Sequence, residues 1–425
     1  MSRSMDNSTR WQFADSYHPY GRYGTNGRRL TRGHVASALA LFLALIGIVG
    51  ASSSASTLGT MKTYSMPSSV TRDCSRDVTA VLNYVIGYLP DNSILKFPAN
   101  GCYRIDGTIR ISGKHGLTLD GGNSRFRAMT NGSELPAKEA RTRDQFIVMN
   151  SSNVTIENAS AVGDNPHAGM SDSAYVPAFE AQQGFDIQSS SFVTLDHDQA
   201  YDVYGDFVYI GGGTTPSRYV TVSNSTFRAN GRIGITVGNA TDVSIHNNNL
   251  DQMRRSVFDL EPYASNWVIE RVTIQDNTIG EARLNFFSSY GRCAVVDNIA
   301  VLQNRLVGQE LNGEIINASD CNIRRRNFTF SGNTSNKAIG TPSGMALKFQ
   351  GVDGISLANN VQPLQPGRNM HLARLTDSSF AAATGNVLPG GVGTIFTNDG
   401  SNSYCYSKNK IGTPLTAELS SKPCG

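Results

Sequence analysis

A short triplet of an apolar, a small polar and a second apolar residue recurs along the chain at nearly constant intervals. Its copies are Val193-Thr194-Leu195, Val220-Thr221-Val222, Val243-Ser244-Ile245, Val272-Thr273-Ile274, Ile299-Ala300-Val301, Phe328-Thr329-Phe330 and Ile355-Ser356-Leu357. They begin 27, 23, 29, 27, 29 and 27 residues apart, and earlier copies begin at Leu117 and Val154. Apolar and polar residues that alternate with period two are typical of a β-strand with one buried face. A repeat of 20 to 50 residues is typical of solenoids and propellers.

The interval predicts stacked coils rather than separate hairpins. Each coil would contain three short strands and three turns, and each strand would lie parallel to its copy in the next coil. Leucine-rich repeats and propellers of similar length would carry a leucine or Trp-Asp signature, which this chain lacks. We therefore predict an all-β fold, a right-handed parallel β-helix.

Asparagines follow the triplets at a similar offset. They are Asn224, Asn247, Asn277, Asn304, Asn333 and Asn359. Asparagine tolerates the left-handed backbone conformation, and its amide can hydrogen-bond to an identical amide stacked above it. We expect these side chains to make the turns and to bond from coil to coil.

Both ends of a solenoid need a cap, because an open coil exposes its core and its unpaired strand edge. Apolar residues at helical spacing run from Val78 to Leu89 in a segment that opens at Asp73 and ends near Pro90, which predicts an N-terminal capping helix. The stretch 391–425 is the predicted C-terminal cap, and 56–390 is the predicted β-helix with its N-terminal cap.

The first 55 residues have the three-part pattern of an export signal. Positions 1–34 are polar and end in a basic run, 35–49 are apolar except for Ser37, and 51–55 are small. This pattern predicts a secretory signal peptide cleaved after Ala55, or else an uncleaved single-pass anchor, although the apolar run is shorter than the roughly 20 residues that span a bilayer comfortably. Either interpretation makes the protein secreted or displayed at the cell surface.

The six cysteines form three pairs of sequence neighbours. These pairs are Cys74 with Cys102, Cys293 with Cys321, and Cys405 with Cys424. An even number of cysteines in an exported chain predicts disulfides. The first two pairs are each 28 residues apart, which is about one coil, so their members should lie stacked and close enough to bond.

The composition limits the choice of partner. Only 17% of residues are charged and the formal net charge is +3. This balance provides no basic face for nucleic acid, and the one predicted membrane contact is the N-terminal anchor. In a chain so poor in charge, a cluster of ionisable residues marks a candidate site.

Strand alternation predicts which of these residues point away from the core. Phe185 and Ile187 face inward, so Asp186 between them should face outward, and the same parity applies to the following coils. The predicted outward row contains Asp186, Tyr209, Arg232, Asp259 and Glu261, with Asp206 at its edge. Later coils add Glu314, Lys348 and His371. The run Arg324-Arg325-Arg326 is expected to be a surface turn.

Several segments of the chain resemble the pectate-lyase-like superfamily of right-handed β-helix proteins. Leu95–Pro98 followed by Tyr103–Ile109 looks like the first coil of its polysaccharide-acting members. The segments similar to its central coils are Gly184–Ile187, Gly205–Ile210, Gly231–Ile235 and Phe258–Pro262. The resemblance implies a β-helix that acts on a polysaccharide, but the Gly-His-Gly motif of polygalacturonase-type hydrolases is absent.

The first functional hypothesis is a glycoside hydrolase, which needs two carboxyl groups about 5 Å or 6.5 to 9.5 Å apart. Carboxylates on neighbouring coils meet these distances, and we expect Asp206, Asp259 and Glu261 to supply the acid and the base. The predicted substrate-binding residues are Asp186, Tyr209, Arg232 and Lys348. Arg232 would orient the substrate, Tyr209 would stack on a sugar, and no metal is required.

Two alternatives remain open at this stage. A polysaccharide lyase would use an Arg or Lys base with Ca²⁺ held by carboxylates, for which Asp196, Asp198 and Asp202 are candidates. A non-catalytic glycan-binding or surface solenoid would use the same outward row for adhesion. The polysaccharide itself and the oligomeric state are not predicted.

Overall fold

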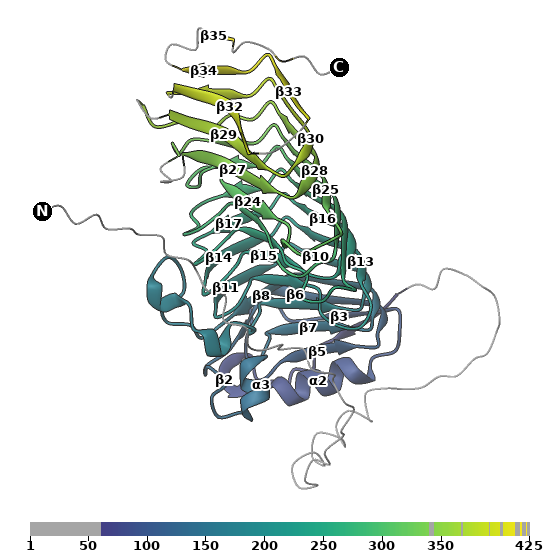
Figure 1. The fold of residues 1–425 in the computed structure, drawn as a ribbon. Coiled ribbons are helices and arrows are strands. Elements are labelled where there is room, and N and C mark those ends of the chain that lie inside the picture. The colour runs from purple at the N-terminus through teal and green to yellow at the C-terminus, as the bar shows by residue number, and fades with distance from the viewer. Residues whose placement is uncertain are drawn as a thin grey trace, which may run out of the picture. The chain divides into compact units, whose positions relative to one another are not determined.

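Stacking of the repeated triplets determines the register of the whole fold. The computed structural model describes residues 61–339, 344–366, 369–390, 392–399, 403–412, 417–418 and 422. The first residue of each triplet lies opposite the first residue of the next in a parallel ladder from Leu117 to Ile355. The predicted right-handed parallel β-helix with its repeat is confirmed (Figure 1).

One sheet carries the outward row and has eleven parallel strands within the described residues. In chain order these strands are β5 (Ile109–Ser112), β7 (Phe146–Met149), β9 (Phe185–Gln188), β12 (Val208–Ile210), β15 (Ile235–Val237), β18 (Phe258–Leu260), β21 (Phe287–Ser289), β24 (Gly313–Ile316), β27 (Met345–Gln350), β29 (Asn369–Thr376) and β32 (Val392–Asp399). We call this the site sheet. Its strands are stacked one above another in Figure 1.

Most of the remaining strands form two further ladders. The triplet ladder contains β1 (Lys62–Ser65), β3 (Ser93–Lys96), β6 (His115–Arg127), β8 (Ser152–Val162), β10 (Ser191–Asp196), β13 (Ser217–Ser223), β16 (Ala240–His246), β19 (Val268–Gln275), β22 (Val295–Leu302), β25 (Arg325–Ser331), β28 (Val352–Ala358), β30 (Ser379–Thr384) and β33 (Tyr404–Ser407). The third ladder contains β2 (Asp73–Asp77), β4 (Cys102–Arg104), the second halves of β6 and β8, β11 (Gln199–Val203), β14 (Thr226–Asn230), β17 (Asn249–Asp251), β20 (Thr278–Ile279), β23 (Arg305–Leu306) and β26 (Thr334–Ser335).

The core lies inside the coils and is filled by the inward residues of all three ladders. Val193, Leu195 and their copies are completely buried or nearly so. Aromatic rings stack along the axis, as Phe146 does on Phe185 with centroids 5.2 Å apart. Each coil therefore buries its apolar residues against those of its neighbours, which accounts for the period-two alternation in the sequence.

A buried ladder of asparagine side chains runs beside the triplet ladder. It consists of Asn248, Asn277, Asn304, Asn333, Asn360, Asn386 and Asn409. In each coil the Nδ2 group donates to the Oδ1 of the asparagine in the next coil, as Asn277 does to Asn304 at 3.0 Å. The same Oδ1 accepts the backbone N–H of Asn277 at 3.1 Å, so one amide satisfies polar groups of two coils.

The predicted asparagine set combined two adjacent positions. Asn277, Asn304 and Asn333 belong to the ladder as predicted. Asn247 and Asn359 lie one residue earlier, with positive φ of 56° and 54°, and they make the turn while the following asparagine makes the bond. The prediction that each asparagine performs both tasks is therefore wrong.

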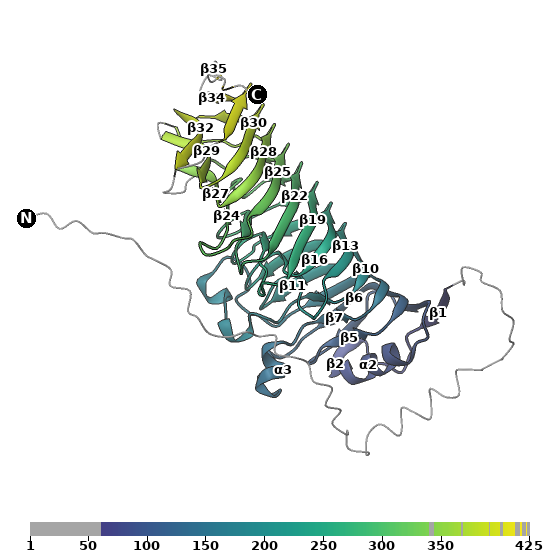
Figure 2. The ribbon, with the colours of Figure 1, turned by 45° about the vertical axis from the view of Figure 1, so that its right-hand side comes forward.

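The N-terminal end is capped by the helix α2 (Thr79–Tyr88), whose Leu82, Val85 and Ile86 are buried. This confirms the capping helix, but the helix begins later than predicted. Residues 73–77 form strand β2, which pairs with β4 beside the disulfide between Cys74 and Cys102. Figure 2 shows α2 and β2 at this end of the β-helix.

At the other end the parallel pairing continues past the predicted boundary at residue 390. Strand β32 pairs with β29 and β33 pairs with β30, both in parallel. Beyond them β34 (Lys410–Gly412), which also pairs with β31 (Val387–Pro389), forms an antiparallel pair with β35 (Ala417–Glu418). This change of direction ends the stacking of parallel strands.

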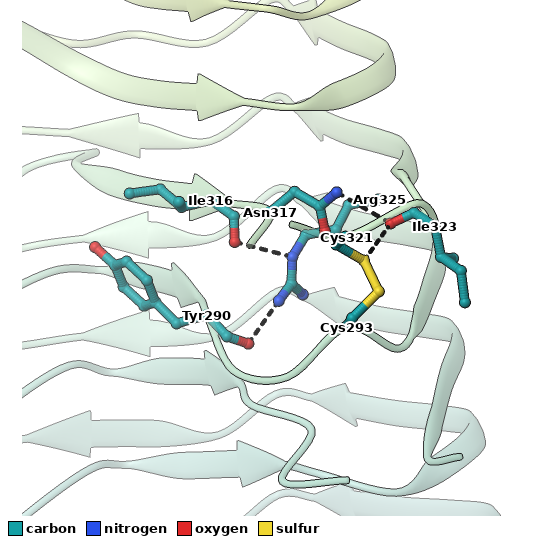
Figure 3. Close-up of a disulfide and its surroundings, with 7 residues drawn as sticks. All are labelled: Tyr290, Cys293, Ile316, Asn317, Cys321, Ile323 and Arg325. Atoms are coloured by element: carbon teal, nitrogen blue, oxygen red, sulfur yellow. Dashed lines mark hydrogen bonds between the residues drawn. A yellow bond between two sulfur atoms is a disulfide. The ribbon is translucent and has the colours of Figure 1, made fainter. Parts of the chain in front are cut away.

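The second predicted disulfide is also present and joins neighbouring coils, with the Cα atoms of Cys293 and Cys321 5.1 Å apart. Close to it Arg325 is completely buried. Its guanidinium donates to the carbonyl oxygens of Ile316 and Tyr290 (Figure 3). The surface turn expected for 324–326 is therefore wrong for Arg325, which opens strand β25 and joins two neighbouring coils.

Some predictions concern residues outside those described. The export signal and the 1–55 segment lie there, and so does Cys424; its predicted partner Cys405 is disulfide-bonded. Among the described residues no helix is long and apolar enough to cross a membrane.

Asp198 occupies the asparagine position in its own coil, and this generates a stability prediction. Its Oδ1 accepts the backbone N–H of Ala159 at 2.8 Å, but its buried Oδ2 has no hydrogen-bond partner in the described structure. Burial raises the pKa of Asp198 well above 3.8. By the register of the ladder, an amide nitrogen at this position would donate to the carbonyl oxygen of Ile156.

We expect Asp198→Asn to raise the free energy of unfolding at neutral pH by about 2 kcal/mol, because it completes a buried hydrogen bond and removes a buried carboxyl. A raised folded-state pKa gives stability that is complete below about pH 4 and is lost as the pH rises through that pKa. The advantage of the variant over the wild type should therefore grow from about pH 4 to pH 7 in urea unfolding experiments. Asn304→Asp is the reverse control and should lose stability over the same range. Equal stability of Asp198→Asn and wild type at every pH would contradict the assignment.

Candidate functional site

The outward positions of the site sheet form one continuous row along the solenoid. Register pairing places Arg110, Ile147, Asp186, Tyr209, Thr236, Asp259, Ser288, Glu314, Lys348, Arg374 and Thr397 one above another. Asp186, Tyr209 and Asp259 thus occupy the same face, and Lys348 follows them in the row. Arg232 and Glu261, which were predicted for the same row, lie outside it: Thr236 and Asp259 occupy the row in their coils.

The first part of this row is covered, so the expectation that its side chains point to solvent is wrong. Asp186 is 2% exposed, Tyr209 is 1% exposed and Asp259 is 7% exposed. A side chain as enclosed as Tyr209 offers no ring face to a sugar. Asp186 and Tyr209 therefore cannot contact a substrate in this conformation.

An irregular segment, 163–183, is bound to the side of the coils next to the row. Its Asp172 forms ion pairs with Arg254 and Arg283, each at 2.9 Å. Tyr175 lies beneath the guanidinium of Arg255, 5.5 Å from the ring centroid, and it donates its hydroxyl to Glu180. The segment brings this glutamate to within 4.0 Å of Arg232.

Asp206 lies at the centre of a closed network and is fully buried. Its carboxylate accepts from the Arg232 guanidinium at 2.8 and 3.1 Å, from the backbone N–H of Ile233 at 3.0 Å and from the hydroxyl of Thr236 at 2.7 Å. With every oxygen engaged and no exposed surface, Asp206 is placed to hold Arg232 rather than to exchange a proton with a substrate. This differs from its predicted role as acid or base.

Arg232 connects that network to the carboxyl groups of the next coil. Its second terminal nitrogen donates to Glu261 at 3.2 Å and to the hydroxyl of Tyr263 at 3.1 Å, and Tyr263 donates to the same Glu261 oxygen at 2.7 Å. Although burial acts to lower it, the pKa of Arg232 is raised well above its ordinary value by Asp206, Tyr263 and Glu261. Arg232 is therefore a permanent cation that fixes the Glu261 carboxylate.

Asp259 has a polar atom that makes no hydrogen bond within the cluster. Its Oδ1 is buried and has no hydrogen-bond partner among the described residues. Burial raises the pKa of Asp259 well above 3.8, and the neighbouring Glu261 raises it further, while Arg232 opposes both effects. Glu261 keeps 22% of its side chain exposed, so the pair combines a buried carboxyl whose pKa is raised with a partly open one.

A second buried acidic pair lies lower in the row. Burial raises the pKa of Asp144 to about 7, and burial together with Asp144 raises that of Asp186 well above 3.8. Asp144 accepts the backbone N–H of Gln183 at 3.1 Å, and Asp186 accepts from Gln188 at 2.6 Å. Asp144, Glu180 and Tyr263 were missed in the sequence because they lie outside the regular strands, where alternation gives no signal.

A small cavity opens further along the row. Its volume is about 180 Å³. It is lined by Asn285, Asn312, Gly313, Glu314, Met345, Ala346, Lys348 and Arg374. Glu314 accepts a hydrogen bond from Tyr290, and Arg374 pairs with Asp399. His371 is not among the lining residues and bonds to Thr394 instead.

The described residues do not provide a metal centre. Asp198 belongs to the buried ladder, while Asp196 bonds to Ser223 and Asn224, so Asp196, Asp198 and Asp202 do not form the expected ligand set. No group of three or more His, Cys, Asp or Glu side chains in the described ranges could hold a metal ion.

The chain matches no protein-family model and no curated protein. Its structure is similar to the tailspike protein of E. coli bacteriophage HK620, with a TM-score of 0.51 and 11% identity over 81% of this chain and 64% of the tailspike. A family 28 exopolygalacturonase of Yersinia enterocolitica gives a TM-score of 0.49 at 11% identity, over 83% of this chain and 78% of that one. The Streptococcus pneumoniae surface adhesin PfbA gives 0.48 at 13% identity, over 81% and 90%. Identities this low show the fold alone, which is a parallel β-helix.

Proposed function

We propose that the protein is an exported carbohydrate-active enzyme that hydrolyses glycosidic bonds of a polysaccharide, with Asp259 as general acid and Glu261 as general base. The observation that carries this proposal is the carboxyl pair at β18, in which one member is buried with a raised pKa and the other is held by Arg232. The disulfides support a location outside the cytoplasm.

The spacing of the two carboxyl groups favours inversion of the sugar configuration. Asp259 and Glu261 are two residues apart at a strand end, and Cα atoms at such positions are about 7 Å apart. Inverting glycosidases need roughly 6.5 to 9.5 Å, which leaves room for a water molecule, whereas retaining enzymes need about 5 Å.

In the proposed reaction Asp259 donates its proton to the glycosidic oxygen as the bond to the anomeric carbon breaks. Glu261 accepts a proton from a water molecule, whose oxygen bonds to that carbon from the opposite face. A general acid must retain its proton near the working pH, and burial beside Glu261 shifts the pKa of Asp259 upward, in the direction that this role requires. Arg232, Asp206 and Tyr263 are positioning residues that hold Glu261.

The proposed path of the glycan follows the row from this pair toward the cavity. Three coils separate Asp259 from Lys348, about 14 Å at the usual strand spacing, and Ser288 and Glu314 lie between them in register. The tailspike of similar fold is known in complex with a pentasaccharide, which supports a sugar chain as the ligand of such a face.

The cavity supports a second candidate, a polysaccharide lyase. Lys348 would remove the proton next to a sugar carboxylate, and Arg374 with the two asparagines would bind that carboxylate. This reaction eliminates the leaving sugar and produces an unsaturated ring, so its products differ from those of hydrolysis. A non-catalytic glycan-binding role predicts neither product.

For the hydrolase, Asp259→Asn and Glu261→Gln should each lower the rate of reducing-end release about 100- to 10 000-fold, because each removes one of the two proton-transfer groups. The assay is a panel of plant, microbial and cell-wall polysaccharides, with and without chelator. Asp276→Asn is the matched control, since this exposed aspartate makes a left-handed turn that asparagine also tolerates. Full activity of both site variants would remove Asp259 and Glu261 from the mechanism.

Lys348→Met separates the two candidate reactions. In a hydrolase it should raise KM while kcat stays close to wild type, because Lys348 then only binds substrate. In a lyase it should abolish the ultraviolet-absorbing unsaturated product, and Asp259→Asn should leave that product unchanged. Absence of both products from the wild-type protein, with binding retained, would reject both reactions in favour of a binding role.

The pH dependence of the activity should reflect the protonation of Asp259. Activity should fall as the pH rises through the raised pKa of Asp259, because the acid must be protonated in the reactive state. Glu261→Gln removes a neighbouring negative charge and should lower the pKa of Asp259 measured by carbon NMR of the labelled carboxyl. An unchanged pKa in that variant would show that the two carboxyls do not interact as proposed.

A further inference from the structure

A second row of special positions runs along the triplet ladder, one residue before each triplet. At this position the backbone takes the left-handed conformation in ten successive coils, with φ between 52° and 72°. The residues are Gly116, Asn153, Phe192, Tyr219, Asp242, Arg271, Asn298, Asn327, Gly354 and Phe380. Register pairing of the flanking residues places them one above another. Figure 2 shows the strands that carry them, β10, β13 and β16 among them, stacked along one edge of the fold.

Six of the ten residues in this row are of the types that the conformation favours; the other four are Phe192, Tyr219, Arg271 and Phe380, of which the first two are adjacent. Glycine, asparagine and aspartate adopt positive φ most easily. Phe192 and Tyr219 have φ of 54° and 55°, where a bulky residue is held against its backbone preference. A feature that costs stability needs another reason to be present.

Burial does not supply that reason. Phe192 is 53% exposed and Tyr219 is 50% exposed, so neither ring belongs to the core. The rings stack on each other with centroids 4.6 Å apart and planes inclined by 13°. Each ring has one face against its partner and the other turned toward a neighbouring coil, where the row contains Asn153 on one side and Asp242 on the other.

We propose that Phe192 and Tyr219 form a glycan-binding surface, separate from the site sheet, that takes a sugar ring against the aromatic pair. Sugar rings present C–H groups on their faces and hydroxyls around their edges. The outer faces of the two rings can pack against the C–H groups of a sugar. Asn153, Arg218 and Asp242 beside the rings can hydrogen-bond to its hydroxyls. Asp242 is held in place by Arg271 through contacts of 2.6 and 3.0 Å.

The size of the surface favours a sugar over a protein partner. With about half of each residue exposed, and a whole aromatic side chain worth about 200 Å², the pair offers roughly 200 Å². A stable protein interface buries about 800 Å² on each side. The neighbours in the row are polar, so the apolar surface does not extend beyond the two rings.

The fold itself provides variants that should remove the rings without harming the structure. Asparagine occupies the same position at Asn153, Asn298 and Asn327, so Phe192→Asn and Tyr219→Asn should keep or raise the midpoint of thermal unfolding. If the rings bind sugar, each change should also weaken binding about fivefold, and the double variant about 20-fold. A purely structural stack predicts the opposite: lower stability with unchanged binding.

Binding is measured by affinity electrophoresis through gels containing xyloglucan, dextran, polygalacturonate or alginate. All proteins carry Asp259→Asn so that cleavage does not interfere, and activity is measured separately with Asp259 intact. Phe380→Asn is the matched control, since Phe380 has φ of 56° and is 71% exposed in the same row but does not belong to the stacked pair.

The proposal is supported if at least one polysaccharide retards the protein and the double variant loses that retardation while Phe380→Asn keeps it. It is overturned if none of the four retards the protein, or if the double variant is retarded as strongly as its parent. Because cleavage depends on Asp259 and Glu261, failure of the proposed hydrolase leaves this result unaffected.

Discussion

Parallel in-register stacking is the constraint on which the rest of the structure depends. Every position in a coil lies about 4.8 Å from its copy above and below. Each side chain must therefore be able to pack or bond favourably with the side chain at the same position of the next coil. Amides satisfy this condition because they both donate and accept, as Asn277 does between Asn248 and Asn304. Like charges repel each other at this distance, and only 17% of the residues are charged.

This constraint also explains what could be read from the sequence. The triplets were identified to the residue, because a one-residue shift would turn the apolar side chains outward. The sequence could not show that Asn247 makes the turn while Asn248 makes the buried hydrogen bond, since the two asparagines are adjacent and only one lies inside the coil. Arg325 was misassigned for a related reason: three consecutive arginines resemble a solvated turn, and the carbonyl oxygens that hold the middle one lie 9 and 35 residues earlier in the chain.

For the candidate site the sequence predicted the face but not its environment. Alternation identified Asp186, Tyr209 and Asp259 as outward residues of one sheet. It could not show that they are buried. Glu180 belongs to the segment at 163–183, which follows no repeat, and the other missed residues, Asp144 and Tyr263, also lie between strands. Burial changes the chemistry more than position does, since it raises the pKa of Asp259 and encloses Asp206.

The longest departures from the repeat occur where the acidic residues gather. In the site sheet the step from Ile109 to Phe146 is 37 residues and the next, to Phe185, is 39, against 23 from Phe185 to Val208. The extra residues form the segments that contain Asp144 and Glu180. A buried ion pair such as Arg232 with Asp206 contributes little net stability over a well-packed apolar core, but it is costly to break. The ion pair therefore serves to hold a side chain in position: through Arg232 it fixes the Glu261 carboxylate on a rigid coil. The loops beside it can vary without disturbing the stacked strands.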